Sequence, residues 1–142
     1  MALYGGFFDA VQDEKTGEYD QEYASGDFTG YFAQFIGSGV CVLDNPDSFK
    51  VRFEGGAAVV SVGYLFIQGY WLKNDADYTV EVSGTASQAI VAHLNTGKLM
   101  IEIEARSVAQ AYPDSLVLGI VNAQAGTADD TRYNTDICGI ID

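Results

Sequence analysis

The stretch Ala89-Ile-Val-Ala-His-Leu-Asn-Thr-Gly-Lys-Leu-Met-Ile-Glu-Ile-Glu-Ala-Arg106 decides the fold class of this chain. Two runs rich in apolar residues, 89–94 and 99–106, flank the triplet Asn95-Thr-Gly97, and this arrangement predicts a β-hairpin. In the second run apolar and polar residues alternate, as in a strand with one buried and one solvated face. We expect Leu99, Ile101 and Ile103 to point inward and Met100, Glu102, Glu104 and Arg106 to point outward.

A period of two residues recurs on both sides of this hairpin. Phe49, Val51 and Phe53 alternate with charged residues, and Asn74-Asp-Ala-Asp77 has the composition of a turn between two further strands. The strands expected beside the hairpin are 49–54, 57–62, 64–68, 70–73, 78–83 and 115–121. Short strands spaced about eight to twelve residues apart predict a mainly β fold, either an antiparallel β-sandwich or a partly closed barrel.

One N-terminal amphipathic helix is expected ahead of the strands. The aromatic residues that recur at the spacing of one helical face are Phe28, Tyr31, Phe32 and Phe35. Asp27 is placed to cap the first turn, and Gly37-Ser-Gly39 would end the helix. Such an aromatic stripe is typical of a core element, so the helix should lie across a sheet.

The remaining segments are read as parts of one domain. Residues 1–26 form an irregular N-terminal lead-in, and Thr127-Ala-Asp-Asp130 is expected to make one helical turn before the apolar tail at 137–141. No internal repeat or linker divides the chain, and 142 residues is an ordinary size for one domain. We therefore expect a single β-rich domain over 1–142.

Composition excludes several classes of protein. Hydrophobic residues make up 48% of the chain, which is too much for a disordered tail. The net charge of −13 would repel nucleic acid and anionic membranes, so neither is an expected partner. Residues 55–72 carry no charge, but their glycines and β-branched residues favour two buried strands over a membrane helix. Because the first residues lack a basic leader, we expect synthesis in the cytoplasm.

The chain has two cysteines, Cys41 and Cys138, both among apolar neighbours. Buried free thiols, a bridge between the two and a reactive thiol are all compatible with the sequence. Two cysteines without a secretory leader do not make a disulfide framework, which favours free thiols.

Catalytic and metal signals are weak. The one histidine, His93, lies within an apolar strand, and no nucleophile, phosphate-binding or dinucleotide motif occurs. Glu102 and Glu104 share a strand face at a spacing compatible with glycoside hydrolysis, but in a chain with twenty acidic residues a solvated face with Arg106 is the favoured explanation. The acidic clusters at 44–47, 74–77 and 129–130 read as turns, not as calcium loops. We expect no enzyme activity, catalytic residue, metal or cofactor.

Two sets of aromatic or aliphatic residues are candidates for binding. Tyr70 and Trp71, with Tyr64 nearby, could stack a sugar, although neighbouring strand residues face opposite sides and at most one of the pair can do so. Apolar residues near the two ends are candidates for an oligomer or partner interface: Tyr4, Phe7, Phe8, Ile140 and Ile141. For the three N-terminal aromatics, packing against the same chain is the open alternative.

The chain resembles tail and baseplate proteins of phages and prophages of Gram-positive hosts, in particular the N-terminal module of tail-fibre, upper-baseplate or receptor-binding proteins. The resemblance rests on Gly6-Phe-Phe-Asp9, the tyrosine-rich lead-in, the aromatic helix, Val60-Ser-Val-Gly-Tyr-Leu-Phe-Ile-Gln-Gly-Tyr-Trp-Leu-Lys-Asn-Asp75, the hairpin at 89–104 and the closing segment 130–141. The chain departs from the family at Ser87-Gln-Ala-Ile90, where an Arg-Ile-Asp-Arg run is common.

This resemblance implies a non-enzymatic structural component of the virion, located in the tail tip or baseplate and acting in assembly of the host-adsorption apparatus. It implies a homotrimer whose other partners are tail and baseplate proteins. The alternative is a carbohydrate-binding module that recognises a bacterial cell-wall glycan, and a glycan hydrolase acting through Glu102 and Glu104 is a third hypothesis.

Overall fold

The computed structural model describes residues 30–34, 36–108, 114–134 and 140–141. Of these residues 53% are in strands and 4% in helix, so the prediction of a mainly β fold is confirmed. The strands are β1 Gly39–Cys41, β2 Val51–Glu54, β3 Ala57–Val60, β4 Gly63–Ile67, β5 Tyr70–Asn74, β6 Tyr78–Val80, β7 Gln88–Asn95, β8 Met100–Ser107, β9 Ser115–Asn122, β10 Thr127–Asp130 and β11 Ile140–Ile141.

The strands form three sheets, with orders β10-β9-β7-β8, β2-β3-β6 and β11-β1-β4-β5. We call them the β7, β3 and β4 sheets. Every pairing is antiparallel except β1 with β11, which is parallel and joins the first described strand to the last. In the described part of the chain no sheet closes into a barrel.

The predicted hairpin forms one side of the β7 sheet, with β8 at the edge. β7 pairs along its whole length with β8, and on its other side with β9. Ile101 and Ile103 pack into the core as expected. Leu99 does not, because it lies in the turn before β8 with a φ of 54° and is exposed. The alternation therefore begins one residue later than the sequence suggested.

The segment Thr127–Asp130 corrects a second expectation, because it is strand β10 and not a helical turn. A tight turn precedes it, in which the backbone N–H of Gly126 donates to the carbonyl of Asn122 at 2.8 Å. This turn brings Thr127 opposite Asn122 and Asp130 opposite Gly119 on β9. Ladder hydrogen bonds to a neighbouring strand thus outweigh the local helix-capping signal of the two aspartates.

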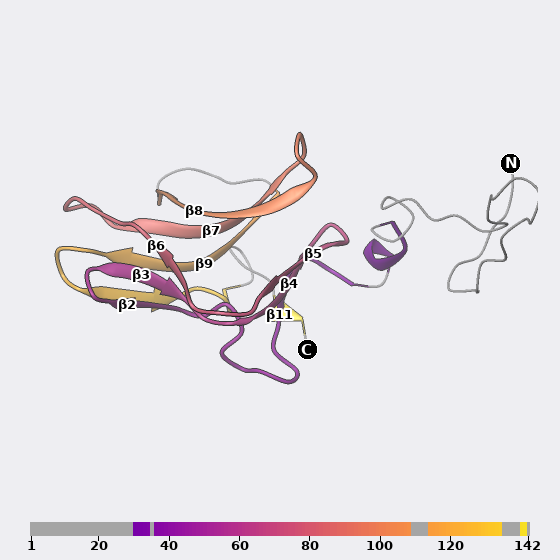
Figure 1. Cartoon of the computed structure of the whole chain (residues 1–142), viewed down its shortest axis with the longest axis horizontal. Coiled ribbons are helices and arrows are strands. Elements are labelled where there is room, and N and C mark those ends of the chain that lie inside the picture. Colours follow the sequence, from indigo (N-terminus) through magenta and orange to yellow (C-terminus); the bar gives the residue numbers. More distant parts are fainter. Residues whose placement is uncertain (1–29, 35, 109–113, 135–139, 142) are drawn as a thin grey trace, which may run out of the picture.

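All three sheets contribute to one core. Figure 1 shows β7 and β8 above β2 and β3, with β4, β5 and β11 on the side of the C-terminus. β9 approaches β2 so closely that a Cβ at Gly119 would lie 2.8 Å from Cβ of Val51. The fully buried core side chains include Val40, Phe49, Val60, Leu65, Ile90, Ala92 and Leu118.

The loop before β2 is held by a buried serine. The Ser48 hydroxyl accepts a hydrogen bond from the backbone N–H of Tyr64 and donates to the carbonyl of the same residue, both at 3.0 Å. This contact leaves no room at Gly63, where a Cβ would lie 2.0 Å from Ser48 Oγ. The start of β4 is therefore fixed against the 43–50 loop.

The expected helix is described only in part. Residues 30–33 are helical. The centre of the Phe32 ring lies 6.1 Å from the centre of the Phe66 ring on β4. Asp27, Phe28 and Phe35 lie outside the described residues, as does the lead-in 1–26, so the full helix stays a prediction.

Candidate functional site

Strand pairing places a set of aromatic side chains on the outside of the β4 sheet. β4 and β5 are joined by Gln68 and Gly69, whose φ values of 51° and 86° are those of a tight two-residue hairpin turn. This turn sets Phe66 opposite Trp71 and Tyr64 opposite Lys73. Leu65 and Ile67, which alternate with Tyr64 and Phe66 along β4, are buried in the core. Side chains alternate along a strand, so Tyr64, Phe66, Trp71 and Lys73 share the other face.

β1 and β11 extend this face. Cys41 is paired with Tyr64 on one side and with Ile141 on the other. We call the set Cys41, Tyr64, Phe66, Trp71, Lys73 and Ile141 the outer aromatic face. Trp71 is 58% exposed and Tyr64 is 46% exposed, which is high for such large side chains.

Within the outer aromatic face, a lysine packs against a tyrosine ring. The ammonium group of Lys73 lies 5.7 Å from the Tyr64 ring centre, within the range of a cation–π interaction. Tyr70, in contrast, packs against the core on the opposite side of the sheet. Of the two residues predicted to stack a sugar, only Trp71 therefore lies on this face.

A hollow of about 610 Å³ opens at one end of the outer aromatic face. Its lining consists of Cys41, Leu43, Asp44, Asn45, Val62, Gly63, Tyr64, Lys73, Asn74 and Asp75. We call it the outer hollow. Leu43, one of its apolar lining residues, is 79% exposed.

Cys41 is a free thiol and is partly buried in this hollow. Burial raises its pKa, which favours the neutral thiol over the nucleophilic thiolate. The arrangement fits a packing role better than a reactive one. Cys138 lies outside the described residues.

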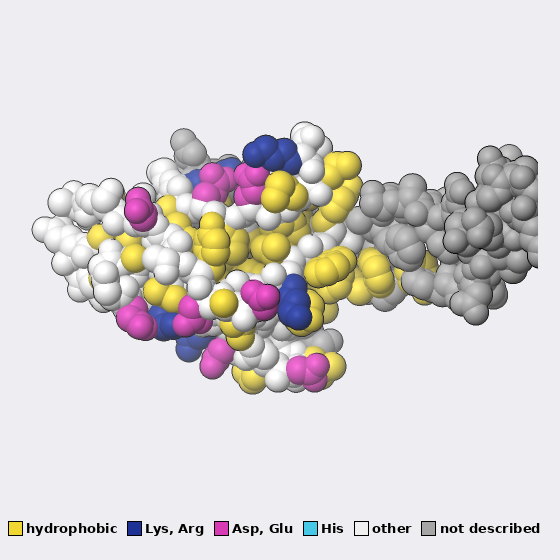
Figure 2. All heavy atoms as spheres, viewed as in Figure 1, with side chains coloured by type: hydrophobic (Ala, Val, Ile, Leu, Met, Phe, Trp, Pro, Cys, Tyr) yellow, Lys and Arg dark blue, Asp and Glu magenta, His cyan; other side chains and the backbone are white. Residues whose placement is uncertain are grey.

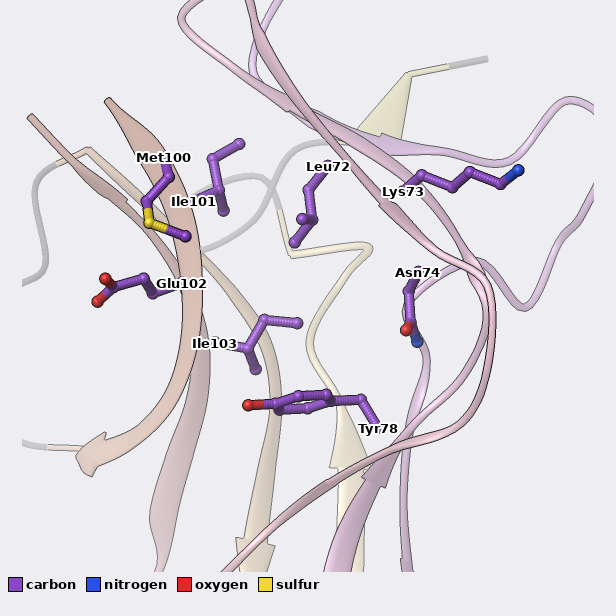
Figure 3. Close-up of a pocket in the computed structure, with 8 residues that line it drawn as sticks. All are labelled: Leu72, Lys73, Asn74, Tyr78, Met100, Ile101, Glu102 and Ile103. Carbon is purple, nitrogen blue, oxygen red and sulfur yellow. The ribbon is translucent and has the colours of Figure 1, made fainter. Parts of the chain in front are cut away.

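A second cavity, of about 460 Å³, lies where three sheet edges meet, because β5, β6 and β8 are each the last strand of their sheet. We call it the edge cleft. In Figure 3 Leu72 from β5 faces Ile101 and Ile103 from β8, and the Tyr78 ring lies across one end. Lys73 and Glu102 point away from the cavity (Figure 3). Apolar side chains of β5 and β8 thus face each other across the cavity, and Asn74 and Tyr78 add polar groups to its lining.

Figure 2 shows the same region from outside. Hydrophobic side chains form a band across the middle of this face, and acidic and basic side chains lie above and below it. The molecule therefore exposes apolar surface at the sheet edges as well as on the outer aromatic face.

The two glutamates considered for hydrolysis are each held by a cation. Glu102 accepts hydrogen bonds from Lys98 Nζ at 3.3 Å and from Asn95 Nδ2 at 3.4 Å. Glu104 is paired with Arg106. These contacts are typical of a solvated strand face. They do not place the two carboxylates on either side of a substrate cavity.

His93 has a neighbour that sequence reasoning did not identify. Its Nδ1 lies 3.0 Å from Ser115 Oγ on β9, and Glu102 is its partner on β8. A serine, a histidine and a glutamate thus stand in a row across three strands. The hydrogen bonds of Glu102 go to Lys98 and Asn95, however, so the row lacks the acid–histidine contact of a catalytic triad.

Among the described residues no group of acidic, histidine or cysteine side chains is placed to hold a metal ion. In the same part of the chain no helix has the length and apolarity needed to span a membrane.

The sequence analysis overlooked Arg132, a charged side chain that is only 2% exposed. Its Nε and Nη2 each donate to one Asp130 carboxylate oxygen at 3.0 Å. Its Nη1 donates to the carbonyls of Pro46 and Ser48 at 3.0 and 2.8 Å. Arg132 thereby ties the residues after β10 to the loop before β2. Only the spacing Asp-x-Arg hinted at this pairing in the sequence.

The predicted interface residues are separated by the fold. Ile140 packs against the core, whereas Ile141 lies on the outer aromatic face. Tyr4, Phe7 and Phe8 lie outside the described residues.

Comparison of the chain with family models, with curated proteins and with solved structures found no match.

Proposed function

We propose that the chain is a non-enzymatic structural component of a phage or prophage tail tip or baseplate and acts in assembly of the host-adsorption apparatus. In this role it forms a homotrimer, contacts other tail and baseplate proteins and is located in the virion. We include in the proposal a β-sandwich, in which the β7 sheet stacks on the other two.

The observation that carries this proposal is the exposed aromatic surface of the outer aromatic face, where Trp71 and Tyr64 project from one side of a sheet. Exposed apolar patches on a protein surface often mark sites of interaction with another molecule. The paired states of Glu102 and Glu104 agree with a protein that binds rather than catalyses. The sequence resemblance supplies the virion context.

Two measurements test the proposal. Light scattering on a sizing column should give three times the chain mass of 15.3 kDa, about 46 kDa. Antibodies against the chain should label the tail tip of the corresponding phage particles in electron micrographs. Absence of the chain from purified particles would remove the proposed role.

A carbohydrate-binding module is the second candidate, and the exposed Trp71 beside Tyr64 is the observation that favours it. An exposed indole can cover the apolar face of a sugar ring, and Lys73 could pair with an anionic group on a cell-wall glycan. The test is binding of cell-wall glycan fragments to the protein and to Trp71→Ala. Met100→Ala, an exposed apolar residue on β8, is the matched control. Equal binding by all three proteins would exclude Trp71 as the contact.

A further inference from the structure

The outer aromatic face and the outer hollow form one continuous surface. Tyr64, Lys73 and Cys41 belong to both, and the exposed Leu43 and Val62 extend the apolar area beyond the sheet. Trp71 projects beside this hollow, since its strand neighbour Phe66 is two residues from Tyr64. A projecting side chain and a recess of suitable apolar character thus lie next to each other.

Charge argues for a particular occupant. The chain carries twenty acidic residues and a net charge of −13, so two copies repel each other through most approaches. The side chains of the outer aromatic face include no carboxylate, and their only charge is that of Lys73. Through this face two copies can approach with less repulsion than through an acidic surface.

The outer hollow carries charges of both signs, so a positive side chain of one copy can lie opposite a negative side chain of another. Lys73 lines it together with Asp44 and Asp75, and no ion pair between Lys73 and either aspartate occurs among the described residues. The surface therefore offers both a cation and carboxylates around an apolar centre. Such a surface can receive a second copy of the chain head-to-tail, which is the kind of contact that a homotrimer requires.

We propose that a second copy of this chain docks on the outer aromatic face around Tyr64 and Trp71, beside Phe66, against which Phe32 of the same chain packs. Trp71 of one copy then enters the outer hollow of the other. Lys73 then faces Asp44 or Asp75 across the contact. The inference rests on the homo-oligomer of the proposed function and names its contact surface, which includes Trp71, Tyr64, Val62 and Leu43.

Trp71 is the only tryptophan in the chain and therefore reports on this surface directly. The experiment records light-scattering mass, tryptophan emission and acrylamide quenching of the full chain over a concentration series at moderate salt. As the mass rises above that of one chain, the emission maximum should move to shorter wavelength and the quenching constant should fall at least twofold.

Two single substitutions make the test specific while leaving Trp71 in place. Leu43→Lys puts a charge into the apolar part of the proposed contact and should abolish both the mass increase and the shielding of Trp71. Val108→Lys changes another exposed apolar residue, outside this surface, and should leave both unchanged. Circular dichroism of each variant checks that the fold is retained.

The outcomes separate the inference from the proposed function. An oligomer in which Trp71 stays as accessible as in the dilute protein overturns the proposed surface but leaves the homo-oligomer standing. A single-chain mass at every concentration overturns both. A change in Trp71 emission on adding bacterial cell-wall glycan fragments at constant single-chain mass would assign the face to glycan instead and also overturn the inference.

Discussion

Arg132 is the residue whose environment differs most from what its type suggests. A guanidinium that is 2% exposed has lost its hydration, and it is stabilised by a bidentate carboxylate and two backbone carbonyls. Removing a buried ionic partner is costly because the groups left behind remain desolvated. Arg52 provides a contrast, since its side chain is 40% exposed although it pairs with Glu54 and Asp77.

Arg132→Met should lower the free energy of unfolding by about 3 to 5 kcal/mol, because it leaves Asp130 and two carbonyls without their donor. Arg52→Met should cost far less, because water replaces the lost contacts of an exposed pair. Urea unfolding followed by circular dichroism measures both. Equal losses for the two variants would contradict the structural role assigned to Arg132.

Asp130 should make stability depend on pH. Burial alone raises the pKa of its carboxyl, but hydrogen bonds from Arg132 and the charge of that residue outweigh burial and hold the pKa below the ordinary value of 3.8. A carboxyl with a lowered pKa in the folded state contributes stability above its unfolded pKa and loses it as the pH falls through the folded pKa.

The loss in stability caused by Asp130→Asn should therefore be full at pH 6 to 7 and shrink below about pH 3.8. Unfolding curves of both proteins at several pH values give this difference. Asp129→Asn serves as the control on the same strand, because Asp129 has no ion pair among the described contacts. A difference that stayed constant down to pH 2 would argue against the pairing with Arg132.

At the scale of elements, the start of β4 depends on a close approach between backbone and side chain. A Cβ at Gly63 would lie 2.0 Å from Ser48 Oγ, and Ser48 is itself buried and hydrogen-bonded to Tyr64. The serine cannot move aside without losing both hydrogen bonds. The outer aromatic face begins at Tyr64, so this contact also positions the proposed docking surface.

Gly63→Ala should reduce the free energy of unfolding by about 1 to 3 kcal/mol, the usual cost of overpacking a core. At Gly97 the nearest atom to an added Cβ is Asn95 Oδ1 at an ordinary 3.4 Å, so Gly97→Ala is the matched control with little expected loss. Thermal unfolding compares the two. If Gly63→Ala melted at the temperature of the unmodified protein, the Ser48 contact would be looser than described.

β10 shows why some elements were not predictable from local sequence. Thr127-Ala-Asp-Asp130 carries residues that favour a helix start, and only the neighbouring strand β9 makes it extended. The hairpin of β7 and β8 was predictable because its alternation and its turn residues agree. Where local signals agree with the partner strand the sequence suffices, and where they disagree the partner decides.

At the scale of the whole molecule, charge governs how copies meet. A net charge of −13 opposes association when screening is weak, since the Debye length is ~30 Å at 0.01 M salt and ~8 Å at 0.15 M. The oligomer fraction should therefore increase between these two salt concentrations at constant protein concentration. Sedimentation velocity measures it, and a fraction that fell with added salt would indicate a contact dominated by ion pairs.

The sequence by itself determined the mainly β character, the central hairpin, most strand positions and the alternation that separates Tyr70 from Trp71. These properties depend on neighbouring residues, whose period of two follows from strand geometry. Only the tertiary structure decided that Trp71 and not Tyr70 faces outward, that β1 pairs with β11, and that Arg132 reaches Pro46, 86 residues away. Such contacts join distant parts of the chain and are selected by packing of the whole core, which no local pattern encodes.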